Sequence, residues 1–131
     1  MRSPDALITR AEFVGGKFLY AVEVDTSDGF ELCPADVCAL GDAFCPAGEE
    51  LRAKFSIVNG IDPALRSRYE AFLAAHGIEV AGIEFIRDAD GMAYTYDVNT
   101  NTNYNPDAEA RAGLSAMTVL ARFLGGELQK L

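Results

Sequence analysis

The sequence has one histidine and three cysteines among 131 residues, and it has no tryptophan. Because His76 has no serine or cysteine partner at a usable spacing, Ser–His and Cys–His nucleophilic catalysis is not expected. Cys33, Cys38 and Cys45 are odd in number, which argues against a closed disulfide framework, and their spacing lacks the C-x2-C pairs of zinc sites. We expect all three cysteines to be reduced and partly buried.

Long hydrophobic runs are also missing. No apolar stretch approaches the roughly 20 residues that a membrane span requires, and residues 1–5 lack the apolar run of a secretory signal. We therefore expect no membrane insertion and a cytoplasmic location.

Positive charge is scarce. The chain has 11 Lys and Arg residues against 20 Asp and Glu residues, for a formal net charge of −9. Such an acidic surface repels phosphate backbones, so binding of nucleic acid by counterion release is not expected. If this chain handles a nucleotide, metal ions or a few local cations must offset its charge.

What remains is the composition of an ordinary globular domain. Half of the residues are hydrophobic and 24% are charged, which separates the chain from disordered proteins. A length of 131 residues is enough for one domain with its own core. We therefore expect a single domain over residues 1–131.

The first element is a predicted hairpin of residues 7–14 and 17–25 around Gly15-Gly16, a dipeptide suited to a two-residue turn. This turn places Val14 opposite Lys17 and Arg10 opposite Ala21. Side-chain alternation then predicts one core face and one polar face. The core face would hold Ala11, Phe13, Phe18, Tyr20, Val22 and Val24, and the polar face would hold Arg10, Glu12, Lys17 and Glu23.

The next segment is less regular. A turn over residues 25–29 leads to a short predicted strand at 30–33 and a short helix at 34–40. The stretch 41–50 is predicted to be a loop, and residues 52–58 a further strand with Phe55 and Ile57 on one side.

Two helices are marked more clearly. The first is predicted to begin after Asp62 as N-cap, with Pro63 at its first position, and to end before Gly77. The second is predicted to begin after Asn105 and to continue as one helix to Gly125-Gly126. Strands in hairpins followed by helices indicate an α+β domain with an antiparallel sheet and two main helices.

The segment between these helices predicts a second hairpin, residues 78–87 and 92–99. With Asp90-Gly91 as a two-residue turn, Glu84 lies opposite Asp97 and Gly82 lies opposite Asn99. Two carboxylates and an amide then share one face. The opposite, inward face would hold Ile83, Phe85, Tyr94, Tyr96 and Val98.

Like charges directly opposite one another destabilise a sheet unless something compensates them. A hard divalent cation is one compensation, since Mg²⁺ is commonly bound by one or two carboxylates together with substrate phosphates and water. A solvated polar face, with one carboxylate protonated or paired to a base, is an equally good explanation from geometry alone. A register shift of one residue would separate Glu84 from Asp97 and remove the predicted site.

The polar run from Asn99 to Asn105 offers a side-chain oxygen at every second position. Asn is a poor strand former, so we expect a loop that passes over the site and ends at the cap of the next helix. The N-terminus of that helix would then lie beside the metal site and suit an anionic ligand. The alternative is an Asn-rich connection with self-capping turns.

Residues 84–99, EFIRDADGMAYTYDVN, resemble the closing hairpin of ATP-grasp enzymes, especially the RimK-like glutamate ligases. The resemblance implies that Glu84, Asp97 and Asn99 bind the Mg²⁺ (or Mn²⁺) ions that hold ATP. Residues 8–21 are similar to the family's sheet after the adenine-binding hinge, and Arg10 matches an arginine that meets phosphate there. Arg10 is thereby implied as the catalytic residue, and Arg10, Asn99 and Asn101 as cofactor-binding residues.

The chain also departs from the family pattern. The usual Asn-x-x-Pro-Gly after the metal motif is replaced by residues 99–106, NTNTNYNP, so the acceptor substrate does not transfer. The family's lysine-bearing strands, glycine-rich flap and adenine hinge should precede Arg10, and only nine residues do. We therefore expect the C-terminal subdomain of an ATP-grasp fold, without the half that holds adenine.

The resemblance implies the metal- and phosphate-binding portion of an ATP-dependent carboxylate–amine ligase that works through an acyl phosphate. Its partners would be ATP and a small-molecule or peptide carboxylate or amine substrate. Alone, the chain is expected to bind ATP weakly and to turn nothing over. The alternative is a non-catalytic metal- or nucleotide-binding or interaction module with the same fold. A third hypothesis is half of a composite domain, which would self-associate or pair with the missing half.

Overall fold

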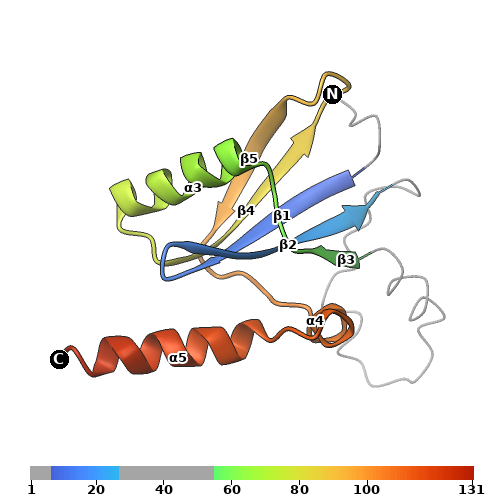
Figure 1. Ribbon diagram of the computed structural model, residues 1–131. Helices are drawn as coiled ribbons and strands as arrows, with labels where there is room; N and C mark the ends of the chain where they lie inside the picture. The colour runs from blue at the N-terminus through green and yellow to red at the C-terminus, as the bar shows by residue number, and fades with distance from the viewer. Residues whose placement is uncertain (1–6, 27–54) are drawn as a thin grey trace.

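The computed structural model describes residues 7–26 and 55–131 (Figure 1). Five strands form one antiparallel sheet in the order β3-β2-β1-β4-β5. The strands are β1 (Leu7–Val14), β2 (Lys17–Asp25), β3 (Phe55–Val58), β4 (Val80–Arg87) and β5 (Ala93–Asn99). The helices are α3 (Pro63–His76), α4 (Pro106–Ala112) and α5 (Ala116–Leu128). The expected strand at 30–33, the helix at 34–40 and all three cysteines lie outside the described residues.

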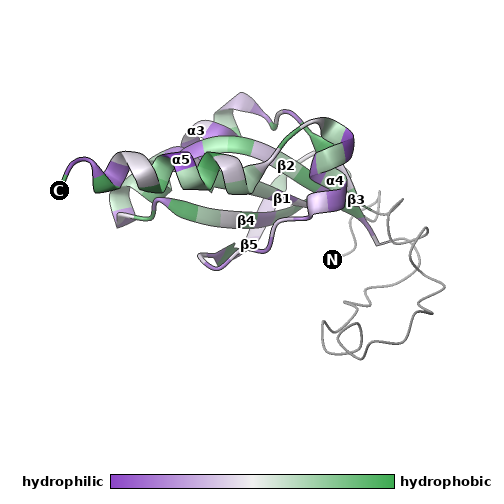
Figure 2. Ribbon diagram, turned by 90° about the horizontal axis from the view of Figure 1, so that it is seen from below, coloured by the Kyte–Doolittle hydropathy of each residue, from purple (hydrophilic) through white to green (hydrophobic). Residues whose placement is uncertain are grey.

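The α+β prediction is confirmed. Figure 1 shows α3 on one face of the sheet and α4 and α5 on the other, so the described residues form three layers. Seen from below in Figure 2, α5 overlies the sheet and carries both hydrophobic and hydrophilic residues. None of the helices in the described part of the chain is long and apolar enough to cross a membrane.

The predicted caps of α3 are confirmed. The Asp62 carboxylate accepts a hydrogen bond from the Leu65 N–H at 3.0 Å, Pro63 occupies the first helical position, and Gly77 ends the helix with φ 64°. A capping carboxylate satisfies one of the N–H groups that the first turn leaves without a helical partner.

The prediction of one long second helix is wrong. Gly113 adopts φ 69° and ends α4, and the Leu114 N–H then bonds the carbonyl of Glu109. Ser115 caps a new helix, α5, by accepting from the Thr118 N–H. A left-handed glycine followed by a capping serine stops one helix and starts another, whereas Gly125 and Gly126 lie inside α5.

The predicted faces of the first hairpin are partly wrong, because β1 and β2 contain a bulge. Glu12 pairs with Tyr20 and Phe13 pairs with Phe18, so Leu19 is an extra residue. An extra residue moves all later side chains of that strand to the other face. Arg10 therefore lies opposite Val22 instead of Ala21.

Both faces of the sheet are covered as a result, which corrects the expectation of one core face and one polar face. On the α3 side, the core is a single apolar cluster of Ala11, Phe13, Ala21, Leu65, Tyr69, Leu73, Ala81, Ile83 and Phe85. On the α4–α5 side, a smaller buried cluster consists of Tyr20, Val22 and Ala116. Tyr20 and Val22 belong to this second face, which Arg10 and Glu12 share.

The second hairpin has the predicted pairing near its end but a different turn. The Asp88 N–H bonds the Met92 carbonyl, which makes the turn one residue wider than predicted. A bulge after Glu84 then compensates, so that Glu84 lies opposite Asp97 as predicted. The pairing of Gly82 with Asn99 is also confirmed.

The same bulge overturns the predicted inward face of β5. Thr95 now lies on the α3 face, where its hydroxyl is 2.6 Å from the hydroxyl of Tyr69. Tyr94 and Tyr96 were expected to pack inward, yet they lie on the other face and are 41% and 52% exposed. Val98 keeps its predicted face opposite Ile83, although it is 36% exposed. β5 is the edge strand, so it has a neighbouring strand of this sheet on one side only.

Candidate metal and phosphate site

Three charged side chains form a row from the central strand of the sheet to its β5 edge. Arg10 on β1 pairs with Glu84 on β4, and Glu84 pairs with Asp97 on β5. Directly opposed residues of antiparallel strands point to the same face. The structure therefore brings the two predicted metal-binding carboxylates and the predicted catalytic arginine onto one face, beside α4 and α5.

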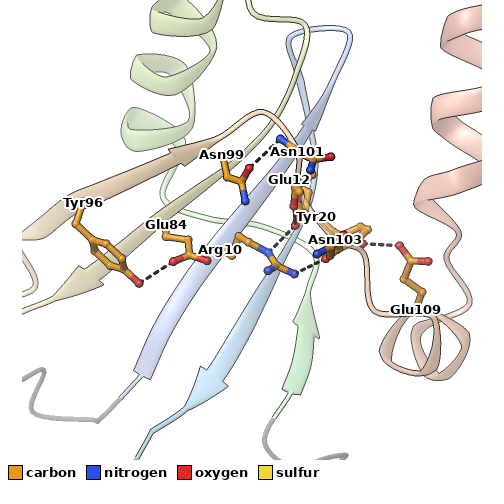
Figure 3. Close-up of polar contacts among 10 residues, drawn as sticks. Arg10, Glu12, Tyr20, Glu84, Tyr96, Asn99, Asn101, Asn103 and Glu109 are labelled. Atoms are coloured by element: carbon orange, nitrogen blue, oxygen red, sulfur yellow. Dashed lines mark hydrogen bonds and ion pairs between the residues drawn. The ribbon is translucent and has the colours of Figure 1, made fainter. Parts of the chain in front are cut away.

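The Glu84 carboxylate has one protein donor. The Tyr96 hydroxyl donates to its Oε2 atom at 3.0 Å, as Figure 3 shows. Partial burial raises the pKa of Tyr96, and the hydrogen bond to Glu84 and the charge of Asp97 raise it further. Within the described residues, Glu84 Oε1 and the Asp97 carboxylate accept no hydrogen bond and form no ion pair. Three carboxylate oxygens are thus left for a ligand.

Asn99 and Asn101 lie next to this row. Asn99 is the last residue of β5, two pairs beyond Asp97 and opposite Gly82. Its Oδ1 atom accepts from the Asn101 N–H at 2.8 Å, which is the Asx turn that Asn commonly forms at the start of a loop. The Asn99 amide oxygen is therefore engaged within the loop, as the alternative of self-capping turns predicts.

Arg10 is held between its own strand and this loop. Its Nε atom lies 2.7 Å from Glu12 Oε1 in a close ion pair. Its NH2 group donates to the carbonyl of Asn103 at 2.9 Å (Figure 3). The guanidinium carries five N–H donors in a fixed plane, so these contacts orient Arg10 and leave donors for a further acceptor.

Glu12 lies behind Arg10 and is fully buried. The Thr102 hydroxyl is 2.9 Å from each of its carboxylate oxygens. Burial raises the pKa of Glu12. This effect of burial outweighs Arg10 and Thr102, which both lower the pKa. Gly82 makes room for this contact: a Cβ atom there would lie 2.9 Å from Thr102 Oγ1.

The helix that follows the loop, α4, contacts the β2–β3 end of the sheet on the same face as the row. The Tyr20 hydroxyl donates to Glu109 Oε1 at 2.5 Å, and the Ala116 N–H donates to the same oxygen at 3.0 Å. In Figure 3, Arg10 lies between Glu84 on one side and Glu109 on the other. The N-terminus of α4 was expected beside the metal site, but α4 lies over β2 and β3, and Asn105 caps its Ala108 N–H.

Four contributors to the site were missed or not assigned a role from the sequence. Glu12 could have been assigned to the site from the sequence, because it is two residues from Arg10 on the same strand and therefore shares its face. Tyr96 reaches the site through a bulge that alternation does not predict. Thr102 and Asn103 act from an irregular loop, where spacing carries no information on direction.

The donor set suits an open site better than a closed metal centre. Among the described residues, no three His, Cys, Asp or Glu side chains are grouped so that they could hold a metal ion. Glu84 and Asp97 supply two carboxylates, and Arg10 supplies a cation beside them. Mg²⁺ sites at phosphates use one or two carboxylates and take their remaining oxygens from phosphate and water, so the residues present fit that class of site.

No protein-family model matches the sequence, and no curated protein matches it significantly. Solved structures do resemble the fold. The ATP-grasp ligase PsnB, complexed with a phosphomimetic variant of a minimal precursor, Mg and ADP, has 13% identity and a TM-score of 0.62, over 94% of this chain and 32% of that chain. A ligase associated with ribosomally synthesised peptides (RiPPs) from Chryseobacterium gregarium, bound to ADP and a leader and core peptide, has 17% identity and a TM-score of 0.55. It is matched over 78% of this chain and 28% of its own.

A third similar structure is the macrocyclase MdnB from Microcystis aeruginosa, with 14% identity and a TM-score of 0.54, over 87% of this chain and 35% of that chain. The chain thus spans about a third of the length of these ligases. Identities this low show the fold and not the activity or a closeness to RimK-like enzymes. The chain has the fold of one part of an ATP-grasp ligase.

Proposed function

We propose that this chain is the metal- and phosphate-binding portion of an ATP-dependent carboxylate–amine ligase, closest to the RimK-like type. Glu84, Asp97 and Asn99 hold Mg²⁺ or Mn²⁺, and Arg10 contacts a phosphate of ATP. The observation that carries this proposal is the row of Arg10, Glu84 and Asp97 across three neighbouring strands. The row supplies carboxylates for a metal ion and a guanidinium for a phosphate on one face.

Electrostatics supports this assignment. Glu84 and Asp97 are opposite one another, and two carboxylates in that position repel unless a cation lies between them. Arg10, the next residue of the row, already has an ion pair with Glu12. A divalent cation beside Glu84 and Asp97, with an anionic phosphate reaching from it to Arg10, would balance the charge of the row.

The chemistry of such a ligase places few demands on side chains of this chain. A metal ion held here would supply positive charge to the phosphoryl group that ATP transfers to a carboxylate. An amine would then attack the carbonyl carbon of the acyl phosphate, with phosphate as the leaving group. Glu84 and Asp97 fix the cation, while Arg10 binds phosphate oxygens and stabilises their charge. Asn99 and Asn101 shape the loop at the edge of the site and contact the cofactor.

The substrate class we propose is a carboxylate or amine of a peptide or small molecule. Two of the similar ligases were solved with a precursor or with leader and core peptides, which favours a peptide. We place the reaction in the cytoplasm, where ATP is available.

We further propose that the site is completed by protein outside this domain. The similar ligases are about three times longer than this chain. Met117, Leu124 and Leu128 on α5 are each more than half exposed, and exposed apolar groups of this kind favour contact with further protein. A non-catalytic interaction module with the same fold is the second candidate that this surface supports, and self-association is a further consequence of it.

Metal binding tests the proposal directly. Mn²⁺ is titrated into the chain, with and without ATP, and binding is followed by water-proton relaxation. Glu84→Gln and Asp97→Asn should each weaken Mn²⁺ binding about tenfold or more, while Asp90→Asn, the same charge change in the hairpin turn, should leave it unchanged. Equal binding by all four proteins would mean that the hairpin is purely structural.

The role of Arg10 has a separate test. Arg10→Lys keeps the positive charge but loses the planar fork that matches phosphate. It should leave Mn²⁺ binding without ATP unchanged and weaken the additional binding that ATP provides. Efficient ATP-dependent ligation by this chain alone would contradict the proposal that it is only part of the catalytic unit.

A further inference from the structure

Tyr96 belongs to the site only because β5 is irregular. The register of β4 and β5 shifts between Glu84 and Phe85, so Tyr96 is the extra residue beside Asp97. Regular alternation would have placed Tyr96 on the α3 face, away from both carboxylates. Bulges near functional sites commonly redirect one side chain in this way.

Packing does not explain the position of Tyr96. Its side chain is 52% exposed, so apolar burial contributes little to holding the ring. The contact that directs it is the hydrogen bond from its hydroxyl to Glu84 Oε2 at 3.0 Å (Figure 3). Tyr94 on the same strand provides a comparison, since its hydroxyl donates to Asp88 at the hairpin turn, 3.1 Å away and outside the row.

We infer that Tyr96 is a positioning residue for the cation site, an inference that rests on the function proposed above. Its hydroxyl holds one oxygen of Glu84, so that the carboxylate keeps one orientation and presents Oε1 to the cation. Without this donor, repulsion from Asp97 turns Glu84 away when no cation is bound. Donors that fix a metal-binding carboxylate typically change metal affinity by about 10- to 100-fold.

The test compares two matched variants, Tyr96→Phe and Tyr94→Phe. Each removes one hydroxyl from the exposed edge strand, and each hydroxyl donates to a carboxylate. The probe is Mn²⁺ alone, titrated into the whole chain, and the urea midpoint of each variant is measured alongside. We expect Tyr96→Phe to weaken Mn²⁺ binding about tenfold and Tyr94→Phe to leave it unchanged, with similar midpoints for both.

A double-mutant cycle with Glu84→Ala separates positioning from a structural role, because Tyr96→Phe should have no further effect on Mn²⁺ binding once Glu84 is absent. Equal or tighter binding by Tyr96→Phe, when the wild-type chain binds Mn²⁺ and Glu84→Gln binds it more weakly, overturns the positioning role and leaves the proposed function intact. An equal loss in Tyr94→Phe also overturns it. Failure of the wild-type chain to bind Mn²⁺ overturns both.

Discussion

The two faces of the central sheet are stabilised in different ways. On the α3 face, nine buried apolar residues form one continuous cluster. On the α4–α5 face, the buried apolar cluster has three residues, and the described buried acids, Glu12 and Glu109, both lie there. The first face holds the fold together by burial, whereas the second is held by specific polar contacts and carries the candidate site.

Aromatic rings dominate the α3 face. The rings of Phe13 and Tyr69 meet edge to face with centroids 6.2 Å apart, and the rings of Tyr69 and Phe85 are 6.0 Å apart. Such pairs add to the free energy that burial of their area already provides. The buried residues of this cluster include no acid or base apart from the Tyr69 hydroxyl.

On the other face, each buried acid has its own partners. Glu12 has Arg10 and Thr102, while Glu109 has Tyr20 and the Ala116 N–H. A buried carboxylate without partners is costly, so each contact is needed once the acid is present. This face gains less from burial than the α3 face, but its side chains are oriented precisely enough to hold Arg10 toward the site.

The largest expected effect is therefore on the α3 face. Phe85→Ala removes a fully buried ring from the centre of the cluster and should lower the free energy of unfolding by about 3–5 kcal/mol. Urea denaturation measures the change. Phe85→Leu, which keeps most of the volume, should lose much less, and equal losses in the two variants would mean that cavity formation is not the cause.

Gly82→Ala applies a steric change to the polar face. The new methyl group would lie 2.9 Å from Thr102 Oγ1 and 3.1 Å from Glu12 Oε2, so the loop would have to move off the sheet. We expect a loss of about 1–3 kcal/mol in urea denaturation, as for other overpacked positions. Gly60→Ala is the control, because no atom lies within 4 Å of a Cβ there, and a similar loss in that variant would exclude the contact with Thr102 as the cause.

Much of the fold could be predicted where local chemistry decides the backbone. Gly15 and Gly16 both adopt positive φ, as a two-residue hairpin turn requires. Asp62 and Asn105 cap the helices that they were predicted to cap. In each case one or two residues determine the conformation, and tertiary packing does not override them.

The two bulges could not be predicted in this way. A bulge is favoured when packing on both faces gains more than the lost pairing costs, and that balance depends on α3, α4 and α5 together. The pairing of Glu84 with Asp97 was right even though the predicted turn was one residue too short, because the bulge at Tyr96 compensated. The role of Tyr96 could not be predicted for the same reason, since regular alternation places its side chain on the opposite face.

The smallest expected effect is a pH dependence confined to the polar face. Burial raises the pKa of Glu12 above its ordinary value of 4.5, so folding favours the protonated acid. The stability that protonated Glu12 contributes is then fully present below about pH 4.5 and is lost as the pH rises through the raised pKa of the folded state. Arg10 and Thr102 oppose this shift and the charge of Glu84 adds to it.

Glu12→Gln removes this titration but keeps an oxygen that can accept from Thr102. The difference in unfolding free energy between the wild-type chain and Glu12→Gln should therefore move against the wild type as the pH rises above about 4.5, and then level off. The change should be smaller than the effect of Gly82→Ala, because the ion pair with Arg10 recovers part of the cost. Urea titrations across this pH range measure it, with the exposed Glu79→Gln as control. A flat difference would contradict this prediction and mean that Arg10 compensates the buried charge completely.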